Sequence, residues 1–248
     1  MTKIIAIANH KGGVGKTTAA ASIGAALATN FKRVLLVDLD AQANLTECFI
    51  SSDEQERTIY DALRYGSPLP IVNIKWNLDL VPSSLQLADI DLYLNTALSR
   101  EYILKDALAP ITEEYDYILL DCPPSLGLVT LNAMVAADEV YVPTTAEALP
   151  AKGLSKLVEV VNTLRQRLNP SLRITGVIIS RWEASNLSEA IEQEIREAFG
   201  KAVFQTRIRK NVAIAEAPVV RKDIFEYSQR SNAAKDYLSL VNEILDRE

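Results

Sequence analysis

The stretch NHKGGVGKTT, residues 9–18, determines how the rest of the chain is interpreted. It follows the apolar run 4–8 and leads into a run of small residues with helical character, 19–28. A strand, a glycine-rich loop and a helix in this order form the setting in which backbone N–H groups bind a polyphosphate. Glycines let the backbone turn those N–H groups inward, where a Cβ would obstruct them. The stretch therefore predicts a phosphate-binding loop.

Two side chains of this loop add chemistry that its backbone lacks. Lys16 is placed to reach terminal phosphates, and the Thr17 hydroxyl is placed to ligate Mg²⁺. The loop departs from the common pattern G-x-x-x-x-G-K-[ST], because His10 replaces the first glycine and Lys11 adds a second lysine. Since Lys16 already serves the phosphates of its own subunit, we expect Lys11 to reach phosphates held by another subunit.

Size and composition limit the protein classes that fit. With 248 residues, 48% of them hydrophobic, the chain is predicted to be one domain spanning residues 1–248. The net charge of −6 argues against coating of nucleic acid by the whole surface, without excluding a local basic patch. Cys48 and Cys122 fit a reducing compartment. No run of about 18 apolar residues appears, so we expect no signal sequence, no membrane span and a cytoplasmic location.

Short β-branched runs alternate with helical patterns along the chain. This alternation predicts an α/β fold, with a mainly parallel, twisted sheet flanked by helices on both faces. Ligands of such sheets bind outside the carboxyl ends of the strands, which brings the loops after residues 8, 38, 121 and 143 together. The expected strands are 3–8, 33–38, 78–82, 117–121, 139–143, 173–180 and 202–206. The expected helices are 16–29, 58–65, 99–108, 126–136, 149–168, 187–199 and 233–245.

Acidic residues stand where two of the expected strands end. Asp38 and Asp40 lie two residues apart at the end of the apolar run 34–38, on the same face. Asp121 ends the run 117–121, and two prolines then stiffen the turn. Carboxylates beside a polyphosphate hold magnesium-bound water and orient an attacking water. Solvated loop acids and helix caps are the alternative for the first pair.

These motifs resemble those of the ParA/MinD family of deviant Walker A ATPases. The similar segments are KGGVGKTT from Lys11, VDLDAQ at residues 37–42, DCPPS at 121–125, and a late block that ends in EAP at 216–218. Ala41 departs from the family pattern, which has proline there. The resemblance covers residues 3 to about 237. It implies a P-loop NTPase fold and a homodimer that sandwiches nucleotide, with Lys11 acting across the interface.

The resemblance also implies ATP and Mg²⁺ as cofactors and assigns roles to residues. Lys11, Lys16 and Asp40 are the expected catalytic residues, with Asp40 in the first switch. The expected metal residues are Thr17, Asp38 and Asp121. The backbone near residues 206–218 is expected to form the adenine wall. The expected nucleotide-binding residues are Lys11, Gly12, Gly13, Val14, Gly15, Lys16, Thr17, Thr18, Asp40, Pro123, Arg181 and Ile208.

Three further side chains have two interpretations each. Trp182 either stacks on a base or is a half-buried aromatic residue at a strand end. Lys152, where relatives often carry an apolar or acidic residue, either contacts phosphate or the interface, or is a solvated lysine at a helix start. Cys122 raises the option of an iron–sulfur relative of the nitrogenase iron proteins, but the placement of the two cysteines favours core or loop thiols.

Basic residues concentrate late in the chain. Residues 196–222 hold seven basic residues against two acids, a local charge of +5 that leaves −11 for the rest. Such asymmetry is an electrostatic footprint for phosphate backbones, although a solvated basic face is the alternative. No recognition-helix module is evident, so any DNA binding is expected to be independent of sequence. The expected DNA-binding residues are Arg196, Arg207, Arg209, Lys210, Arg221 and Lys222.

The resemblance implies a partition or positioning ATPase. Its ATP dimer is expected to bind DNA nonspecifically, and a ParB-like or cargo-adaptor protein to stimulate hydrolysis, so that chromosome or plasmid DNA is segregated on the nucleoid. Positioning of a protein cargo such as carboxysomes is an alternative, and a metabolic P-loop ligase is an alternative of another class. The last helical segment, 232–248, carries a net charge of −2, which argues against the basic, membrane-seeking tail of MinD-like regulators.

Overall fold

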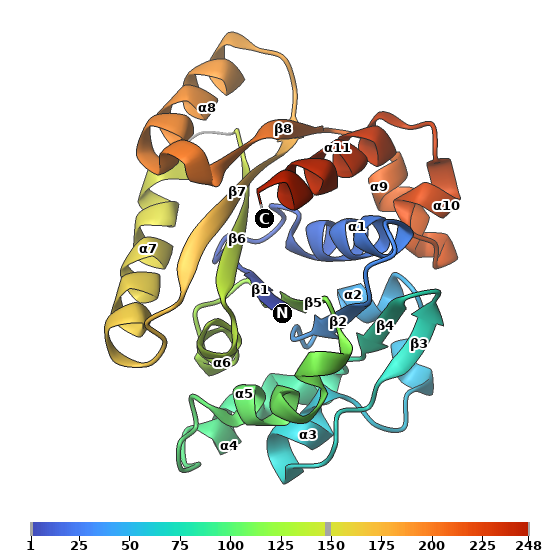
Figure 1. The fold of residues 1–248 in the computed structure, drawn as a ribbon, viewed down its shortest axis with the longest axis vertical. Helices are drawn as coiled ribbons and strands as arrows, with labels where there is room; N and C mark the ends of the chain where they lie inside the picture. The colour runs from blue at the N-terminus through green and yellow to red at the C-terminus, as the bar shows by residue number, and fades with distance from the viewer. Residues whose placement is uncertain (1, 147–149, 248) are drawn as a thin grey trace.

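The computed structural model describes residues 2–146 and 150–247, with the side chains of 150–153 left out. Within these ranges one eight-stranded sheet has the order β3-β4-β2-β5-β1-β6-β7-β8 (Figure 1). The neighbouring strands are parallel, apart from the antiparallel pair β3 and β4. The strands are β1 Lys3–Ile7, β2 Val34–Asp38, β3 Val72–Lys75, β4 Leu78–Val81, β5 Tyr117–Asp121, β6 Glu139–Thr145, β7 Arg173–Trp182 and β8 Val203–Arg209.

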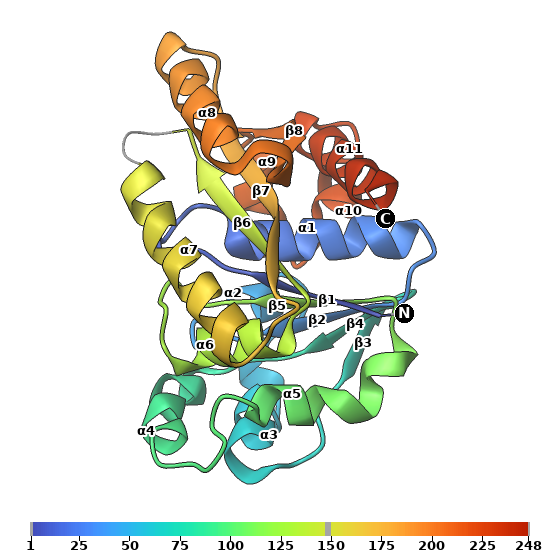
Figure 2. The same ribbon diagram turned by 60° about the vertical axis from the view of Figure 1, so that its left-hand side comes forward.

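Helices cover both faces of this sheet, and Figure 2 shows α1 on one side of the strands and α3 and α5 on the other. The predicted α/β fold with a mainly parallel sheet is therefore confirmed. The helices are α1 Lys16–Thr29, α2 Asn44–Glu47, α3 Ile59–Tyr65, α4 Ile90–Leu94, α5 Ile103–Leu108, α6 Leu128–Ala136, α7 Pro150–Arg167, α8 Asn186–Phe199, α9 Ala213–Glu216, α10 Ile224–Ser228 and α11 Asn232–Asp246.

Successive residues of the strands point to opposite faces of the sheet and so belong to two separate hydrophobic cores. Ile5 and Leu36 pack with α1 and α11, whereas Ala6 and Leu35 pack with the helices α3 to α8 on the opposite face. All five residues of β2 and all five of β5 are buried, as expected for central strands covered on both sides. This burial explains why these strands read as continuous apolar runs rather than alternating ones.

The helix α1 packs directly against the sheet. A Cβ added to Gly24 would stand 2.6 Å from Leu36 Cδ2, so any larger residue would have to displace the Leu36 side chain on β2. The alanines around it bury most of the helix without holding the backbone away from the strands. The sequence thereby fixes the N-terminus of α1 directly above the carboxyl ends of β1 and β5.

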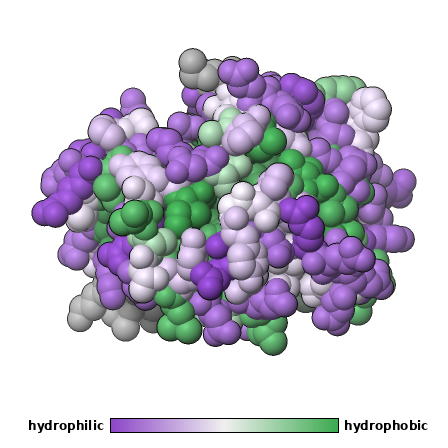
Figure 3. Space-filling view, turned by 90° about the horizontal axis from the view of Figure 1, so that it is seen from below, coloured by the Kyte–Doolittle hydropathy of each residue, from purple (hydrophilic) through white to green (hydrophobic). Residues whose placement is uncertain are grey.

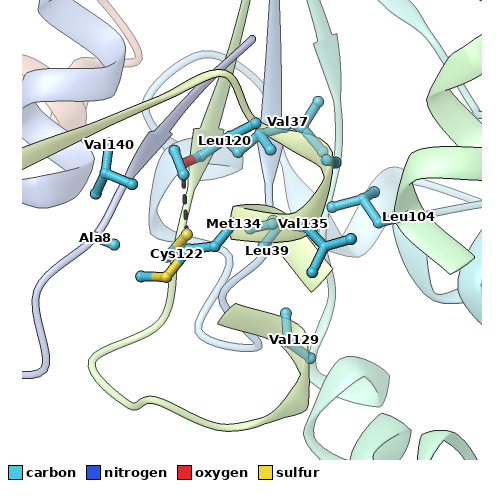
Figure 4. Close-up of a cluster of buried hydrophobic side chains, with 14 of the residues drawn as sticks. Ala8, Val37, Leu39, Leu104, Leu120, Cys122, Val129, Met134, Val135 and Val140 are labelled. Atoms are coloured by element: carbon cyan, nitrogen blue, oxygen red, sulfur yellow. Dashed lines mark hydrogen bonds between the residues drawn. The ribbon is translucent and has the colours of Figure 1, made fainter. Parts of the chain in front are cut away.

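The face opposite α1 holds the second core, and Figure 4 shows Cys122 within it. The Cys122 Sγ lies 3.7 Å from the Leu120 carbonyl oxygen, among Val37, Met134 and Val140. Cys48 is buried as well. Burial raises the pKa of Cys48 to about 12 and moves the pKa of Cys122 upward too. Both thiols are buried, and the high pKa keeps them protonated.

The molecular surface is not uniformly polar. Figure 3, the view from below, shows apolar residues between hydrophilic ones on the side that carries α3, α4 and α5. Leu92 of α4 and Leu98 after it expose 74% and 95% of their area. In the described part of the chain, no helix is both long and apolar enough to cross a membrane.

Some elements differ from the predicted ones. The edge strand β3 was not expected, and it pairs with β4 across a tight turn in which Asn77 adopts a φ of 57°. The strands β6, β7 and β8 each continue beyond their predicted ends. The short helices α2, α4, α9 and α10 were also not expected, because four or five residues carry too little periodicity to be recognised.

Candidate nucleotide-binding site

The loop between β1 and α1 has the backbone that its glycines predict. Gly13 and Gly15 adopt φ values of 73° and 89°, in the left-handed region that side chains with a Cβ rarely occupy. Gly15 directly precedes the first residue of α1. The first turn of this helix has N–H groups without partners inside the helix, which makes its end an anion-binding site.

The ends of two neighbouring strands hold this loop in place. Asn9 Nδ2 donates to the Pro143 carbonyl oxygen at 2.8 Å, and Asn9 Oδ1 accepts from the Lys11 N–H at 3.1 Å. The Ser180 Oγ lies 2.7 Å from the Val14 carbonyl oxygen and 3.0 Å from that of Thr144. The loop is therefore fixed from both β6 and β7 before any ligand arrives.

A pocket of about 480 Å³ opens over the loop, a volume typical of sites for small molecules and cofactors. One wall is polar and comes from the loop, α1 and the segment after β2. The other wall is more apolar and comes from α9, α10 and the chain between them. The lining residues are Gly12, Gly13, Gly15, Lys16, Thr17, Thr18, Ala21, Ser22, Asp40, Gln42, Asn44, Glu47, Cys48, Pro124, Ile214, Ala217, Pro218, Lys222, Asp223 and Ile224.

Two carboxylates lie side by side beneath this pocket. Asp38 and Asp121 are register partners on the parallel strands β2 and β5, and both are fully buried. Asp38 Oδ2 accepts from the Thr46 N–H at 2.8 Å and from Thr46 Oγ1 at 2.7 Å. The two carboxylate oxygens of Asp121, in contrast, make no hydrogen bond of ordinary geometry with the described residues, although the Thr17 hydroxyl and the Lys16 ammonium lie near enough to favour the charged form.

Burial disfavours the charged form of both acids. It raises the pKa of Asp38 to about 6, although the hydrogen bonds from Thr46 act in the opposite direction. Burial also raises the pKa of Asp121 well above its usual range, and the nearby Asp38 carboxylate adds to that shift. A buried, ionised carboxylate in such a position is unfavourable unless a cation neutralises its charge.

The residues present fit a magnesium ion. No group of three or more His, Cys, Asp or Glu side chains in the described residues forms a metal cage. Mg²⁺ is usually bound by one or two carboxylates together with substrate phosphates and water, which is the donor set this pocket offers. Asp121 and the neighbouring Thr17 are placed to supply protein oxygens, whereas both oxygens of Asp38 already accept hydrogen bonds, one from Thr46 and the other from the Asp40 N–H.

Lys16 is a buried cation at the loop. Its side chain belongs to a residue only 7% exposed, and its Nζ lies 3.4 Å from the Lys11 carbonyl oxygen, a long contact. Desolvation lowers the pKa of Lys16, while the Asp121 carboxylate acts to raise it. A buried ammonium with one weak acceptor is suited to receive phosphate oxygens.

The other two predicted catalytic residues lie nearer the solvent. Asp40 lines the pocket, and its Oδ1 accepts from the Gln42 N–H at 3.0 Å, which fixes the carboxylate direction. Lys11 is exposed on the loop and does not line the pocket of its own chain. That placement suits a lysine that acts outside its own subunit.

Several predicted nucleotide residues lie outside the lining of the pocket. The Ile208 side chain is 1% exposed and packs in the core, and Val14 is equally buried. Pro124 rather than Pro123 lines the pocket. The Arg181 guanidinium lies 3.4 Å from the Gly13 carbonyl oxygen, on the outside of the loop. The side chain of Lys152 lies outside the described residues.

Residues that the sequence interpretation did not name complete the pocket. Gln42, Asn44 and Glu47 follow the twin aspartates, and Ile214 and Ile224 form the apolar wall. The late block ending in EAP did indicate this second wall, but the wall is built from the short helices that the periodicity could not reveal.

The predicted basic residues are distributed between several partners. Arg196 and Arg207 both contact Glu192, and Arg209 pairs with Asp236 through two hydrogen bonds, at 2.6 and 3.0 Å. Lys210 lies 3.2 Å from Glu183, and Arg221 lies 3.6 Å from Glu47. Lys222 lines the nucleotide pocket.

A glycine-rich loop at a helix N-terminus, a buried lysine and a buried carboxylate define the class of P-loop ATPases. The family model described as "AAA domain" matches residues 2–174. The chain is 42% identical to the sporulation initiation inhibitor protein Soj of Bacillus subtilis, over 98% of each chain. It is 39% identical to the chromosome partitioning protein ParA of Caulobacter vibrioides, over 99% of this chain and 95% of that one. The chain therefore belongs to the ParA/Soj family of partition ATPases.

Solved structures agree with this assignment. The cobyrinic acid a,c-diamide synthase of Mycobacterium smegmatis, with bound ADP and magnesium, matches with a TM-score of 0.87 and 31% identity. The match covers 99% of this chain and 94% of that one. The predicted family, fold and enzyme class are confirmed, and similar structures bind ADP or an ATP analogue with magnesium.

Proposed function

We propose that this ATPase dimerises around two ATP molecules, binds DNA without sequence preference in that state, and releases DNA on hydrolysis. A partner adaptor stimulates the hydrolysis, and repeated cycles segregate chromosome or plasmid DNA. The observation that carries the proposal is the buried pair Lys16 and Asp121 at the loop: the two groups favour each other's charge, yet Lys16 has one long hydrogen bond and Asp121 none of ordinary geometry among the described residues. Nucleotide and metal would satisfy these two groups. The protein would therefore bind them much more tightly in one conformation than in another, which is what a nucleotide-driven switch requires.

Each side chain has a distinct chemical role in this proposal. Mg²⁺, when bound, neutralises charge on the phosphate oxygens, and Thr17 and Asp121 hold it. Lys16 and the N–H groups of the loop stabilise the charge that develops on the transferred phosphoryl group. Asp40 orients the attacking water and accepts its proton, from a position fixed by the Gln42 N–H.

The dimer places Lys11 opposite the phosphates of the partner subunit. Its exposure outside the pocket of its own chain supports this role. With a slowly hydrolysed ATP analogue, light scattering after gel filtration should give twice the monomer mass, and Lys11→Ala should prevent the shift. A monomer at saturating analogue would contradict the proposed dimer.

The basic segment 196–222, with its local charge of +5, supports nonspecific DNA binding. The test is retention of random-sequence duplex with the ATP analogue and, separately, with ADP. We expect retention with the analogue, reduced steeply by salt, and little retention with ADP. Equal retention in both states would refute a nucleotide switch.

The same cycle serves a protein cargo such as a carboxysome if the adaptor binds that cargo instead of DNA. A metabolic ligase is the alternative of another class, and the similarity to a diamide synthase supplies a specific reason to test it. A ligase hydrolyses ATP only with its second substrate, so turnover stimulated by DNA and adaptor alone would exclude it.

A further inference from the structure

One buried acidic side chain of α8 contacts the basic segment 196–222 from just outside it. Glu192 is 3% exposed, a burial that glutamate rarely shows unless it is paired. Arg196 Nε donates to Glu192 Oε1 at 2.8 Å, from one turn further along the same helix. Arg207 Nε, from β8, donates to the same oxygen at 2.9 Å. One buried carboxylate thus holds two of the arginines expected to bind DNA.

Both arginines have additional contacts that fix them in this arrangement. Arg196 Nη2 donates to the Phe204 carbonyl oxygen at 3.1 Å, which joins α8 to β8. The Arg207 guanidinium carbon lies 4.7 Å from the centroid of the Trp182 ring, within the range of a cation–π interaction. Trp182 is half-buried, and its Nε1 has no partner among the described residues, so its contact with Arg207 is through the ring face.

The shared carboxylate changes the charge that DNA would meet. Glu192 lies just before the 196–222 segment, so the +5 of that segment does not include it. The side chains of Arg196 and Arg207 are only 26% and 43% exposed. Rotating either one outward to a phosphate would leave the Glu192 carboxylate buried with one partner fewer, which is unfavourable. Each arginine therefore offers DNA much less than a full, mobile charge.

We propose that Glu192 lowers and sets the affinity for DNA by withholding Arg196 and Arg207 from the phosphate backbone. The inference rests on the proposed nonspecific DNA binding and identifies a residue that regulates it. A weak basic surface suits a cycle that must release DNA repeatedly, because tight contacts would slow dissociation.

The decisive variant is Glu192→Gln, which keeps the shape and an acceptor oxygen but removes the charge. We expect tighter binding to random-sequence duplex in the presence of the ATP analogue. One added phosphate contact corresponds to about 8-fold at 0.1 M salt, and two correspond to about 60-fold. The slope of log K against log salt should become more negative by about 0.9 for each added contact.

Glu194→Gln is the matched control. Glu194 lies on the same helix, is exposed, and has no hydrogen bond or ion pair among the described residues. Its loss removes the same formal charge without releasing an arginine, so the salt slope should stay that of the unmodified protein. An equal gain in both variants would mean that general charge, rather than the buried carboxylate, sets the affinity.

Arg207→Gln tests the same idea without altering Glu192. In the otherwise unmodified protein it should weaken DNA binding less than 2-fold, because Glu192 already neutralises the guanidinium. In the Glu192→Gln background the same change should remove most of the gain. A loss of about 8-fold or more from Arg207→Gln alone would overturn the proposal, because it would show a full phosphate contact.

Fluorescence supplies a readout independent of DNA. The chain has two tryptophans, and Trp76 can be replaced by phenylalanine because it is exposed on the β3–β4 turn. In that background, Glu192→Gln should change the emission and acrylamide quenching of Trp182 as Arg207 leaves its ring. Unchanged Trp182 emission together with unchanged DNA affinity would show that Glu192 only joins α8 to β8.

Failure of the proposed function and failure of the role of Glu192 give different results. If the unmodified protein retains no DNA with the ATP analogue, the proposed function fails, and this inference fails with it. If it retains DNA but Glu192→Gln binds no more tightly, only the role of Glu192 is refuted.

Discussion

The phosphate loop, residues 9–18, and the basic segment, residues 196–222, differ in whether their charged side chains have partners within the fold. At the loop, Lys16 and Asp121 are buried, and their polar atoms have weak partners or none among the described residues. In the basic region, Arg207 and Arg209 are partly exposed, and carboxylates hold both. Charges of the first kind make folding less favourable and indicate a ligand, whereas charges of the second kind are already satisfied by the fold. A count of charges along the sequence cannot separate these two situations.

Lys16→Ala should give the largest effect, because it removes the only buried cation found at the loop among the described residues. We expect kcat/KM for ATP to fall about 10³-fold, the upper range for losing one preorganised electrostatic contact. Steady-state hydrolysis and calorimetric nucleotide binding would measure the loss. Lys235→Ala, an exposed lysine on α11, is the control and should hydrolyse ATP normally.

Asp40→Ala should come next, because it affects the chemical step more than binding. Turnover should fall about 10²-fold, the scale of a general base, while the affinity for nucleotide stays within about 3-fold. The protein should then accumulate as the ATP-bound dimer. Normal turnover in this variant would remove Asp40 from the mechanism.

Asp121→Asn should stabilise the nucleotide-free protein while abolishing magnesium-dependent turnover. It replaces an acid whose burial disfavours the charged form with a neutral amide, so the unfolding free energy should rise at pH values where the acid is ionised. Chemical denaturation with and without Mg²⁺–ATP would measure both effects. A destabilised, nucleotide-free variant would show that the ionised carboxylate already has a partner in the apo protein.

The same acids predict a pH dependence of stability. Asp38 has a pKa raised to about 6, above the roughly 3.9 of an unfolded chain, so the folded state binds the proton more tightly. The contribution of Asp38 and Asp121 to the unfolding free energy of the nucleotide-free protein should therefore rise as pH falls from about 7 toward 4. Asp121→Asn should flatten part of this slope. A stability that rises with pH in this range would contradict the burial argument.

Lys210→Ala should have the smallest effect. It tests whether a weakly paired lysine of the basic segment contributes to DNA binding. Its pair with Glu183 is exposed and 3.2 Å long, and such pairs contribute about 0–1 kcal/mol, so Lys210 can move to a phosphate. DNA affinity should fall by no more than about 8-fold, with stability unchanged. If Arg209→Ala weakened DNA binding more than Lys210→Ala, then pairing with Asp236 would not withhold the arginine.

Much of the fold was predictable because its signals are local. The glycine loop, the apolar runs ending at Asp38 and Asp121, and the small residues of α1 each determine one element and its position. The strand β3 was not predicted, since four residues with a partly polar pattern become a strand only by pairing with β4. Asn77, with its positive φ, was the signal that could have revealed this turn.

The candidate site was predictable only in part, for a related reason. The motifs placed Lys16, Asp40 and Thr17 at the pocket, where the structure also has them. The partners of the basic residues, Glu192 and Asp236, lie outside the segment whose charge was summed. Pairing across elements is a tertiary property, so neither spacing nor composition contains it.

The end of β7 connects the two regions compared above. Ser180 contacts the carbonyl oxygen of Val14 inside the loop, and Trp182, two residues later, lies under Arg207. Arg181 between them adopts a φ of 51°, a conformation that leaves little freedom for adjustment. In the proposed cycle, a rearrangement of the loop on nucleotide exchange would therefore reach Arg207 through these three consecutive residues of one strand. The proposed coupling between hydrolysis and DNA binding would then run along the end of β7.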